Sequence, residues 1–232
     1  MRDVIIALDF SNGKIALDFL DKFSNVKPFV KIGMELFYAE GPSIVKTIKE
    51  RGHKIFLDLK LHDIPNTVKG AMRSVSNLGV DIVNVHAAGG IEMMKAALEG
   101  ATQDNGSRPL IVAITQLTSI SQIVMQDELW IGRDINETIL HYAKNTKEAG
   151  LDGVVCSPLE AGFIKKELGN NFITITPGVR FLDEDSGDQV RITTPAKAKE
   201  TGTDYIVVGR PITKAKYPVD AYNRCKIEFM GA

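Results

Sequence analysis

The feature that most constrains the fold of this chain is a regular alternation of short apolar runs with longer amphipathic segments. Most of the eight runs are nearly continuous in Val, Ile, Leu and Phe, which is typical of parallel strands that are buried on both faces. They cover residues 4–8, 28–32, 54–59, 81–85, 110–115, 153–156, 172–176 and 205–208. The pattern therefore predicts eight strands, each followed by a helical segment.

The segments between these runs have helical spacing of their apolar residues. Ser11 or Asn12 is a candidate N-cap, and Pro42 stands at a first-turn position. The clearest helices are predicted over residues 12–23, 42–51, 66–78, 91–99, 136–149 and 158–168. A glycine follows five of them, at the position where a left-handed residue commonly ends a helix: Gly52, Gly79, Gly100, Gly150 and Gly169.

Chain length decides between the architectures that alternate strands and helices. The 232 residues leave roughly 29 for each unit, close to one compact crossover between parallel strands. No linker rich in Pro, Ser or Gly divides the chain. We therefore predict an α/β protein, a (β/α)8 TIM barrel forming a single domain over residues 1–232. The alternative is an open doubly wound sheet, but the segment after the first run, residues 9–13, has no GxGxxG motif.

Composition and charge exclude several classes of protein. The chain has 28 Lys and Arg against 29 Asp and Glu, so it lacks the basic excess of a general nucleic-acid-binding protein. Cys156 and Cys225 are too few for a disulfide scaffold and lie in no zinc-binding motif. No apolar run approaches the roughly 20 residues of a membrane helix, and the N-terminus does not resemble a secretion signal. We expect a cytoplasmic protein that binds neither nucleic acid nor membrane.

Ionisable residues stand where five of the predicted strands end. In a barrel these ends meet at one rim, which is where active sites lie. Charges beside an apolar core are costly unless they pair, and such paired networks are typical of active sites. The residues are Asp9, Lys31, Asp58, Lys60, Asp63, Arg180 and Arg210. A functional network at this rim is therefore predicted.

The third run carries the sharpest part of this pattern. Alternate residues of a strand face the same side, so Asp58 and Lys60 share one face while Leu57 and Leu59 share the other. A lysine between aspartates stays protonated, because nearby negative charge favours its charged form. Lys60 is therefore predicted to act as a cation and proton donor, and not as a Schiff-base nucleophile.

The ends of the seventh and eighth runs predict a phosphate site. Loops after these two strands often bind phosphate in barrels, and arginine side chains suit phosphate oxygens. Gly178 and Gly209 permit close approach of the backbone to a ligand, beside Arg180 and Arg210. Residues 181–189 are polar, and they are either a lid that closes over the phosphate or an ordinary exposed loop.

These segments together resemble the orotidine 5′-phosphate decarboxylase family, in its short bacterial form. Residues 57–67, Leu-Asp-Leu-Lys-Leu-His-Asp-Ile-Pro-Asn-Thr, are similar to the family signature in length and spacing. Residues 6–9, 30–33, 116–119, 176–180 and 207–212 match further family segments in the same order. The resemblance extends from end to end of the chain.

The resemblance implies decarboxylation of orotidine 5′-monophosphate to uridine 5′-monophosphate, in pyrimidine biosynthesis. It implies that Lys31, Asp58, Lys60 and Asp63 form an alternating charge network. Within it, Lys60 would protonate C6 of the pyrimidine as carbon dioxide leaves. No metal and no organic cofactor are expected.

The resemblance also implies roles in substrate binding and assembly. Asp63 and Thr67 would reach into the active site of a partner subunit, which makes the expected enzyme a homodimer with shared sites. The remaining expected substrate contacts are Asp9 with the ribose, Thr118 with the pyrimidine, and Arg180, Gln189, Gly209 and Arg210 with the 5′-phosphate.

Two other functions stay open at this point. A sugar-phosphate decarboxylase of the same superfamily shares Asp-x-Lys-x-x-Asp, but it uses magnesium and an acidic ligand near the second strand, where this chain has Lys31 and then Glu35. A barrel that binds a phosphate ligand without catalysis is the other candidate. The four histidines, His53, His62, His86 and His141, are expected to have structural or loop roles, because they lack HxH and HExxH spacing.

Overall fold

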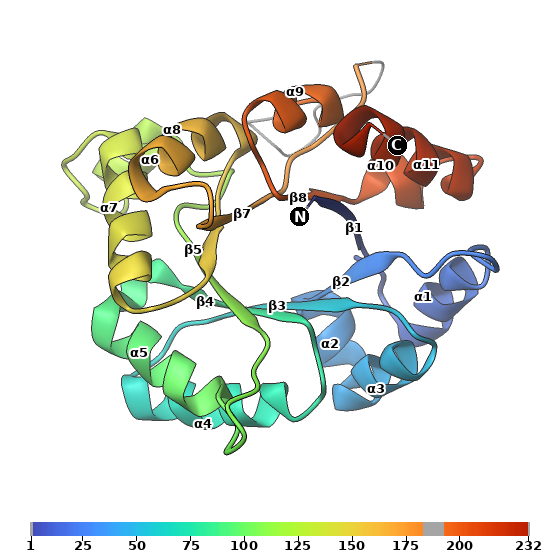
Figure 1. The fold of residues 1–232 in the computed structure, drawn as a ribbon, viewed down its shortest axis with the longest axis horizontal. Helices are drawn as coiled ribbons and strands as arrows, with labels where there is room; N and C mark the ends of the chain where they lie inside the picture. The colour runs from blue at the N-terminus through green and yellow to red at the C-terminus, as the bar shows by residue number, and fades with distance from the viewer. Residues whose placement is uncertain (1, 183–192, 232) are drawn as a thin grey trace.

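The computed structural model describes residues 2–182 and 193–231, and its parallel strands close into an eight-stranded barrel in which β1 pairs with both β2 and β8. Figure 1 looks along the barrel and shows the strands as a ring surrounded by helices. The strands are β1 (Asp3–Ala7), β2 (Phe29–Gly33), β3 (Ile55–Leu61), β4 (Ile82–His86), β5 (Leu110–Ile114), β6 (Gly153–Val155), β7 (Ile173–Thr176) and β8 (Tyr205–Val208). The predicted (β/α)8 barrel is confirmed.

The helices lie outside this ring and connect successive strands, except for the last two, which follow β8. They are α1 (Gly13–Leu20), α2 (Met34–Glu40), α3 (Pro42–Glu50), α4 (Pro65–Ser76), α5 (Gly90–Ala101), α6 (Gln122–Asp127), α7 (Ile135–Glu148), α8 (Pro158–Leu168), α9 (Pro195–Glu200), α10 (Arg210–Thr213) and α11 (Pro218–Met230), with the short 3-10 helix η1 (Ala87–Gly89) before α5. None of the helices that the structure describes combines the length and hydropathy needed to span a bilayer.

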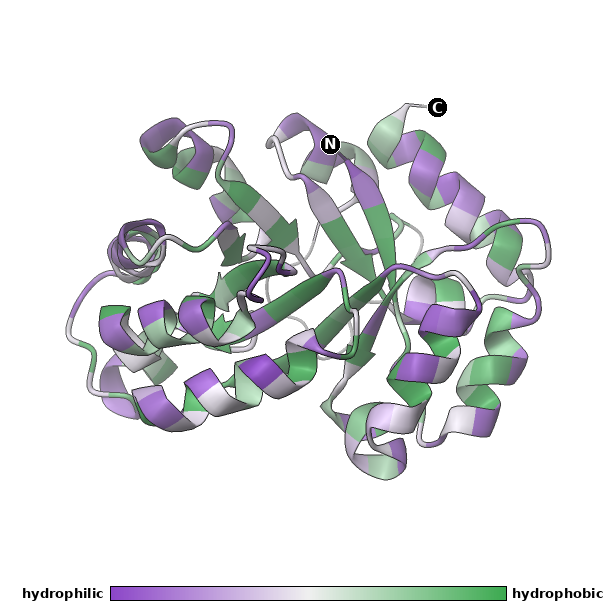
Figure 2. Cartoon of the chain, turned by 60° about the horizontal axis from the view of Figure 1, so that its bottom comes forward, coloured by the Kyte–Doolittle hydropathy of each residue, from purple (hydrophilic) through white to green (hydrophobic). Residues whose placement is uncertain are grey.

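Apolar side chains fill both sides of the barrel wall. Alternate strand residues such as Ile5, Phe29, Phe56 and Ile82 pack against one another inside the barrel. The intervening residues pack between the strands and the helices in a larger apolar layer. Figure 2 shows this arrangement as hydrophobic strands enclosed by helices that are hydrophobic on one side and hydrophilic on the other. The apolar runs of the sequence are therefore strands that are covered on both faces.

Several predicted helix ends differ from the structure. Helix α1 ends at Leu20 instead of residue 23, and α4 ends at Ser76 instead of residue 78. The helix over residues 91–99 was expected to end before Gly100, but α5 continues to Ala101. Gly100 lies inside the helix where it crosses α4, and a Cβ atom there would lie 2.2 Å from the carbonyl oxygen of Lys69. Gly100 is therefore required for close packing of two helices and does not terminate one. Gly52, in contrast, has the predicted left-handed conformation, with φ of 87°.

A recurring contact, which we call the carboxylate clamp, fixes the amino-terminal ends of the strands. Each clamp is an aspartate directly before an even-numbered strand, whose Oδ2 accepts a hydrogen bond from a backbone N–H at the start of the preceding strand. Each also pairs with a basic side chain. The clamps are Asp81 with Ile55 N (2.8 Å) and Lys49, Asp152 with Ile111 N (2.7 Å) and Arg108, and Asp204 with Thr174 N (2.8 Å) and Lys165.

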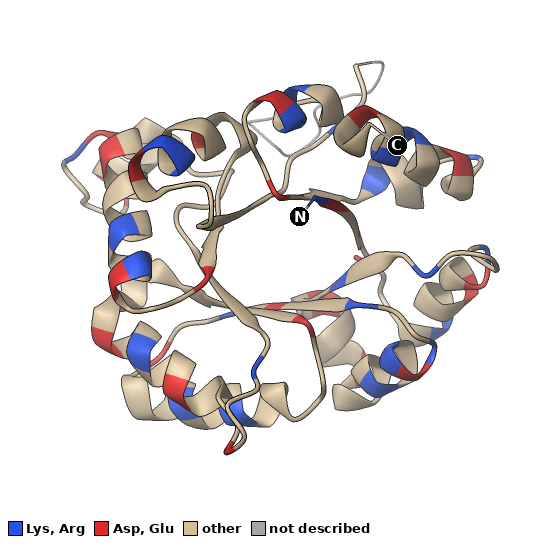
Figure 3. Ribbon diagram, in the orientation of Figure 1, with Lys and Arg blue, Asp and Glu red and all other residues tan. Residues whose placement is uncertain are grey.

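Charged residues are distributed unevenly over the fold. Figure 3 shows them spread over the surrounding helices, whereas the strands carry few. Lys31 and Asp58 are exceptions, since they lie on strands and are 9% and 7% exposed. Buried charges of this kind are costly unless they are paired, so their surroundings point to the functional site.

Candidate active site

A cavity of about 600 Å³ opens at the carboxyl ends of the strands. This volume is in the range of pockets that hold small ligands. Its apolar wall is formed by inward-facing strand residues that include Ala7, Phe56, Ile114, Val155 and Val207. Its polar wall is formed by Asp9, Lys31, Asp58, Lys60, Gln116, Thr118, Ser119, Arg180, Arg210 and Lys214. The predicted rim residues thus surround one cavity, with the exceptions described below.

Four of these side chains form a row of alternating charge. The Nζ atom of Lys31 lies 2.9 Å from Oδ1 of Asp9 and 3.4 Å from Oδ2 of Asp58. The Nζ atom of Lys60 lies 2.7 Å from Oδ1 of Asp58. Each charged group therefore has at least one partner of opposite charge, which offsets the cost of burial. The sequence prediction that Asp58 and Lys60 share a face is confirmed.

The row keeps its two most buried members charged. Burial by itself favours the neutral amine of Lys31, but the carboxylates of Asp58 and Asp9 outweigh it and raise the pKa of Lys31. Burial likewise favours the neutral acid of Asp58, but Lys31 and Lys60, with hydrogen bonds from Lys60 and Asn84, lower the pKa of Asp58. The cavity therefore presents fixed charges at neutral pH.

Gly33 leaves the space that this row needs. A Cβ atom at Gly33 would lie 2.8 Å from Nζ of Lys31 and 3.2 Å from Oδ1 of Asp9. The ion pair between Lys31 and Asp9 therefore occupies the space that a side chain at position 33, the last residue of β2, would fill.

Asn84, on β4, binds two members of this row, a role that is not predicted from the sequence. Asn84 is 1% exposed, donates from Nδ2 to Oδ1 of Asp58 at 2.6 Å, and accepts the backbone N–H of Lys60 at 2.8 Å. Lys60 has a left-handed backbone with φ of 53°, which is uncommon for a residue with a side chain and is found at strained functional sites. An uncharged residue inside an apolar run gave no sequence signal for this role.

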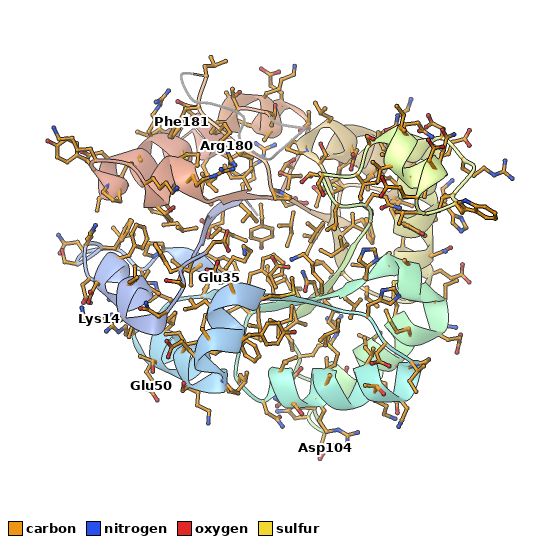
Figure 4. All side chains as sticks on the ribbon, turned by 180° about the vertical axis from the view of Figure 1, so that it is seen from behind. Lys14, Glu35, Glu50, Asp104, Arg180 and Phe181 are labelled. Atoms are coloured by element: carbon orange, nitrogen blue, oxygen red, sulfur yellow. The ribbon has the colours of Figure 1, made fainter. Side chains whose placement is uncertain are left out.

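The other end of the cavity is lined by the segments that follow β7 and β8. Gly178, Arg180, Gly209 and Arg210 are there, and Lys214 joins them from the residue after α10. Arg180 is 8% exposed and donates from Nη1 to the carbonyl oxygen of Val179 at 2.8 Å. Figure 4 shows Arg180 and Phe181 beside the C-terminal helices. Lys214 is not predicted from the sequence, since a lysine on an exposed turn carries no signal until the fold places it beside the cavity.

Residues that follow β5 complete the cavity wall. Thr118 lines it as predicted, together with Gln116 and Ser119, which were not singled out. Gln116 is 5% exposed, so its amide is a buried polar group beside the cavity. This side of the cavity therefore offers hydroxyl and amide groups, which can donate or accept hydrogen bonds.

Three predicted site residues lie elsewhere or outside the described structure. Asp63 and Thr67 are exposed and do not line the cavity; Asp63 lies in a separate hollow with His62, Ile64, Pro65, Ala88 and Gly89. The carboxylate of Asp63 accepts the backbone N–H of Ile64 at 2.6 Å. Gln189, and with it most of the predicted lid at 181–189, lies outside the described residues.

The imidazole rings of His62 and His86 stack beside this hollow. Their ring centroids are 5.3 Å apart with an angle of 17° between the planes. The pKa of His86 is lowered, mainly by burial and further by the nearby His62 and Lys60. Over residues 2–182 and 193–231, no three His, Cys, Asp or Glu side chains gather as metal ligands. Glu35, the acidic residue after β2, is exposed on α2 and does not line the cavity (Figure 4).

Comparison with known proteins identifies the family. The model of the orotidine 5′-phosphate decarboxylase / HUMPS family matches residues 2–225. A protein of Geobacillus sp. strain WCH70 named orotidine 5′-phosphate decarboxylase is 56% identical over 230 residues, which cover 98% of this chain and 96% of that protein. A protein of the same name from Bacillus cytotoxicus is 55% identical, with 99% of this chain and 98% of that protein covered.

A solved structure agrees with these relatives. The crystal structure of orotidine 5′-phosphate decarboxylase from Lactobacillus acidophilus has a TM-score of 0.88 and 42% identity, with 99% of each chain covered. Sequence and fold match over nearly the whole length, and the chain belongs to the orotidine 5′-phosphate decarboxylase / HUMPS family.

Proposed function

We propose that this protein decarboxylates orotidine 5′-monophosphate to uridine 5′-monophosphate in pyrimidine biosynthesis, and that residues 1–232 act as one decarboxylase domain in the cytoplasm. Its full-length relatives carry the name of this activity. The single observation that most supports the proposal is the row of Asp9, Lys31, Asp58 and Lys60 in the cavity. Two ammonium groups and two carboxylates in fixed alternation suit a reaction in which negative charge moves from a carboxylate to carbon.

Lys60 is the proposed proton donor. When the bond between C6 and the carboxylate breaks, its electron pair stays on C6 and carbon dioxide leaves. The ammonium group of Lys60 stabilises this charge and then gives a proton to C6, after which solvent reprotonates the amine. The bond from Nζ of Lys60 to Asp58, at 2.7 Å, supports this role because it fixes the direction of the lysine side chain.

The phosphate is proposed to bind at the other end of the cavity. Arg180, Gly209 and Arg210 line that end, and Gln189 is proposed to join them. Asp9 is proposed to contact the ribose and Thr118 the pyrimidine. Binding energy from a phosphate that is remote from C6 can organise the site for the transition state.

The active enzyme is proposed to be a homodimer with shared sites. Asp63 and Thr67 are exposed and do not line the cavity of their own chain, which suits residues that complete the site of a partner. In the partner's cavity, the carboxylate of Asp63 would extend the alternation of charge beyond Lys60. No metal or organic cofactor is included in this proposal.

The activity is tested directly by absorbance. Purified protein without added metal is expected to consume the ultraviolet absorbance of orotidine 5′-monophosphate and to release one uridine 5′-monophosphate per substrate. Addition of EDTA is expected to leave the rate unchanged. Binding of the nucleotide without turnover would leave only a binding function, and loss of activity in EDTA would contradict the absence of a metal.

A further inference from the structure

Asn84 is a buried amide in the middle of the inner barrel wall. It faces the interior with Ile82, two residues earlier on β4, and its neighbour in the pairing of β4 with β5 is the apolar Val112. At 1% exposure it is out of contact with solvent, so its amide needs protein partners.

Both ends of this amide are bound to the row of charges. Nδ2 lies 2.6 Å from Oδ1 of Asp58, and Oδ1 lies 2.8 Å from the backbone nitrogen of Lys60. A carboxylate only accepts hydrogen bonds and a backbone N–H only donates, so the orientation of the amide is fixed by its partners. One side chain therefore holds the carboxylate of one residue and the backbone of another.

The contact with Lys60 lies where the regular pairing of β3 with β4 is interrupted. The pairing of β3 with β4 shifts register between Leu57 and Leu61, and the left-handed Lys60 lies inside this shift. Its N–H donates a hydrogen bond to Oδ1 of Asn84 on β4. The hydrogen bond therefore supports the backbone conformation from which the Lys60 side chain projects into the cavity.

We propose that Asn84 is a positioning residue of the decarboxylation reaction. It orients Asp58, favours its ionised form, and holds the backbone of Lys60 so that Nζ lies against Asp58 and at the reacting carbon. This role rests on the proposed function, because it acts through the proton donor of that reaction.

Two substitutions separate the two hydrogen bonds. Asn84→Ala removes both of them. Asn84→Asp keeps the shape and the acceptor for the Lys60 N–H but places an acceptor against Asp58. Thr115→Val is the matched control. Thr115 is a fully buried polar residue directly after the neighbouring β5, and its Oγ1 donates to the carbonyl oxygen of Val155 at 3.1 Å. It does not line the cavity.

The expected loss is in turnover and not in binding. Asn84→Ala is expected to lower kcat by about 100-fold, the effect of a misplacement on the order of 1 Å. KM and the affinity for uridine 5′-monophosphate are expected to stay close to those of the unchanged protein, since Arg180 and Arg210 are not altered. Thr115→Val is expected to lower the melting temperature while keeping kcat.

The pH profile of Asn84→Asp gives the readout that a purely structural residue would not change. The groups facing this position are Asp58 and Lys60 of β3, with Lys31 behind Asp58 and His86 two residues further along β4. Burial and the adjacent Asp58 hold the introduced carboxyl group in its neutral form to higher pH. When neutral, it donates a hydrogen bond to Asp58, so kcat relative to the unchanged protein is expected to rise about tenfold per pH unit of acidification until the group is fully protonated.

A ratio of kcat that does not vary with pH, or an Asn84→Ala variant that keeps kcat as Thr115→Val does, would overturn the proposal. Turnover by the unchanged protein tests the proposed function by itself. A crystal structure of Asn84→Asp at low and high pH supplies a readout that needs no turnover: the Lys60–Asp58 contact should form only at low pH, and an identical contact at both pH values would contradict the role.

Discussion

Nζ of Lys60 lies 2.7 Å from Oδ1 of Asp58, and the two residues are separated by only Leu59 on the same strand. Strand geometry places both side chains on the inner face of the barrel, while Leu59 packs with the apolar layer outside. The proposed proton donor is therefore held by a carboxylate that the same short sequence supplies. Removing either group changes the charge of the cavity without touching the phosphate end.

Lys60→Ala is expected to abolish most turnover while preserving ligand binding. Loss of a positioned proton donor costs about 10²- to 10⁴-fold in rate, and kcat should fall by at least the lower value. Affinity for uridine 5′-monophosphate, measured by calorimetry, should stay within the same order of magnitude because the arginines are intact. A variant that keeps its kcat would contradict the assignment of Lys60 as donor.

Mixing two inactive variants tests the shared site. Asp63→Ala and Lys60→Ala proteins should each be inactive alone, yet mixed dimers should regain activity, because one of their two cavities combines an intact Lys60 with an intact Asp63 from the other chain. Random exchange of equal amounts should restore about a quarter of the normal activity, since half the dimers are mixed and each has one complete site. Subunit exchange, followed with differently tagged chains, is the necessary control; exchange without recovered activity would rule out sharing.

Lys214 is expected to increase the rate at which a phosphate-bearing substrate is captured. It lines the cavity beside Arg210, and attraction of an anion by an exposed cation weakens as salt screens it. Lys214→Gln should lower kcat/KM several-fold at low ionic strength, and the difference should shrink at high salt. Lys216→Gln is the matched control, because Lys216 does not line the cavity and lies 5.3 Å from the ring centroid of Tyr217. Equal effects of the two changes at every salt concentration would argue against a specific role for Lys214.

Gly100→Ala and Gly70→Ala should change stability in opposite directions. The added methyl group at position 100 would meet the backbone of Lys69 at 2.2 Å, so overpacking should lower the free energy of unfolding by about 1–3 kcal/mol or more. Gly70, on α4 beside that same contact, has open space around it, and alanine there should raise stability by about 0.5–1 kcal/mol. Urea unfolding of both variants measures the difference; a neutral Gly100→Ala would mean that α4 and α5 can separate at little cost.

His53 is expected to make the protein less stable in mild acid. It is 2% exposed, its Nδ1 lies 2.9 Å from the carbonyl oxygen of Pro28, and burial, aided by Lys27 and Arg51, lowers its pKa. The unfolded chain therefore binds the proton more tightly, so the free energy of unfolding should fall as the pH drops below about 6.5.

Urea unfolding at pH 7.5 and pH 5.5 measures this effect. His53→Gln should show a smaller loss of stability between the two pH values than the unchanged protein. His141→Gln, at an exposed position on α7, should show the full loss. If His53→Gln loses as much stability as the unchanged protein, the acid sensitivity arises elsewhere.

The sequence predicted the strands of this barrel to within a residue or two at each end, because continuous apolar runs and parallel strands covered on both faces are the same physical pattern. It also placed Asp58 and Lys60 on one face, since that relation is local. The predicted end of helix α5 comes too early, because a glycine in a helical segment can mark either the end of the helix or a close crossing with another helix. Only the packing of α4 against α5 distinguishes them.

The parts of the site that were missed depend on distant segments. The role of Asn84 arises from the pairing of β3 with β4 and from a register shift that no periodicity reveals. Gln116 and Lys214 likewise gain their significance only when the barrel closes and brings the ends of β5 and β8 to one cavity. Charged strand ends are visible in a sequence, whereas neutral side chains that support them are visible only in three dimensions.

The carboxylate clamps at Asp81, Asp152 and Asp204 divide the barrel into modules. Each clamp stays within one consecutive pair of strands, β3 with β4, β5 with β6, or β7 with β8. A break in the connection after α5, before Arg108, would therefore leave every clamp whole inside one of two fragments. The barrel could therefore be divided at this connection into two half-barrels that can be separated, exchanged or recombined. Each half-barrel would keep its own carboxylate clamps.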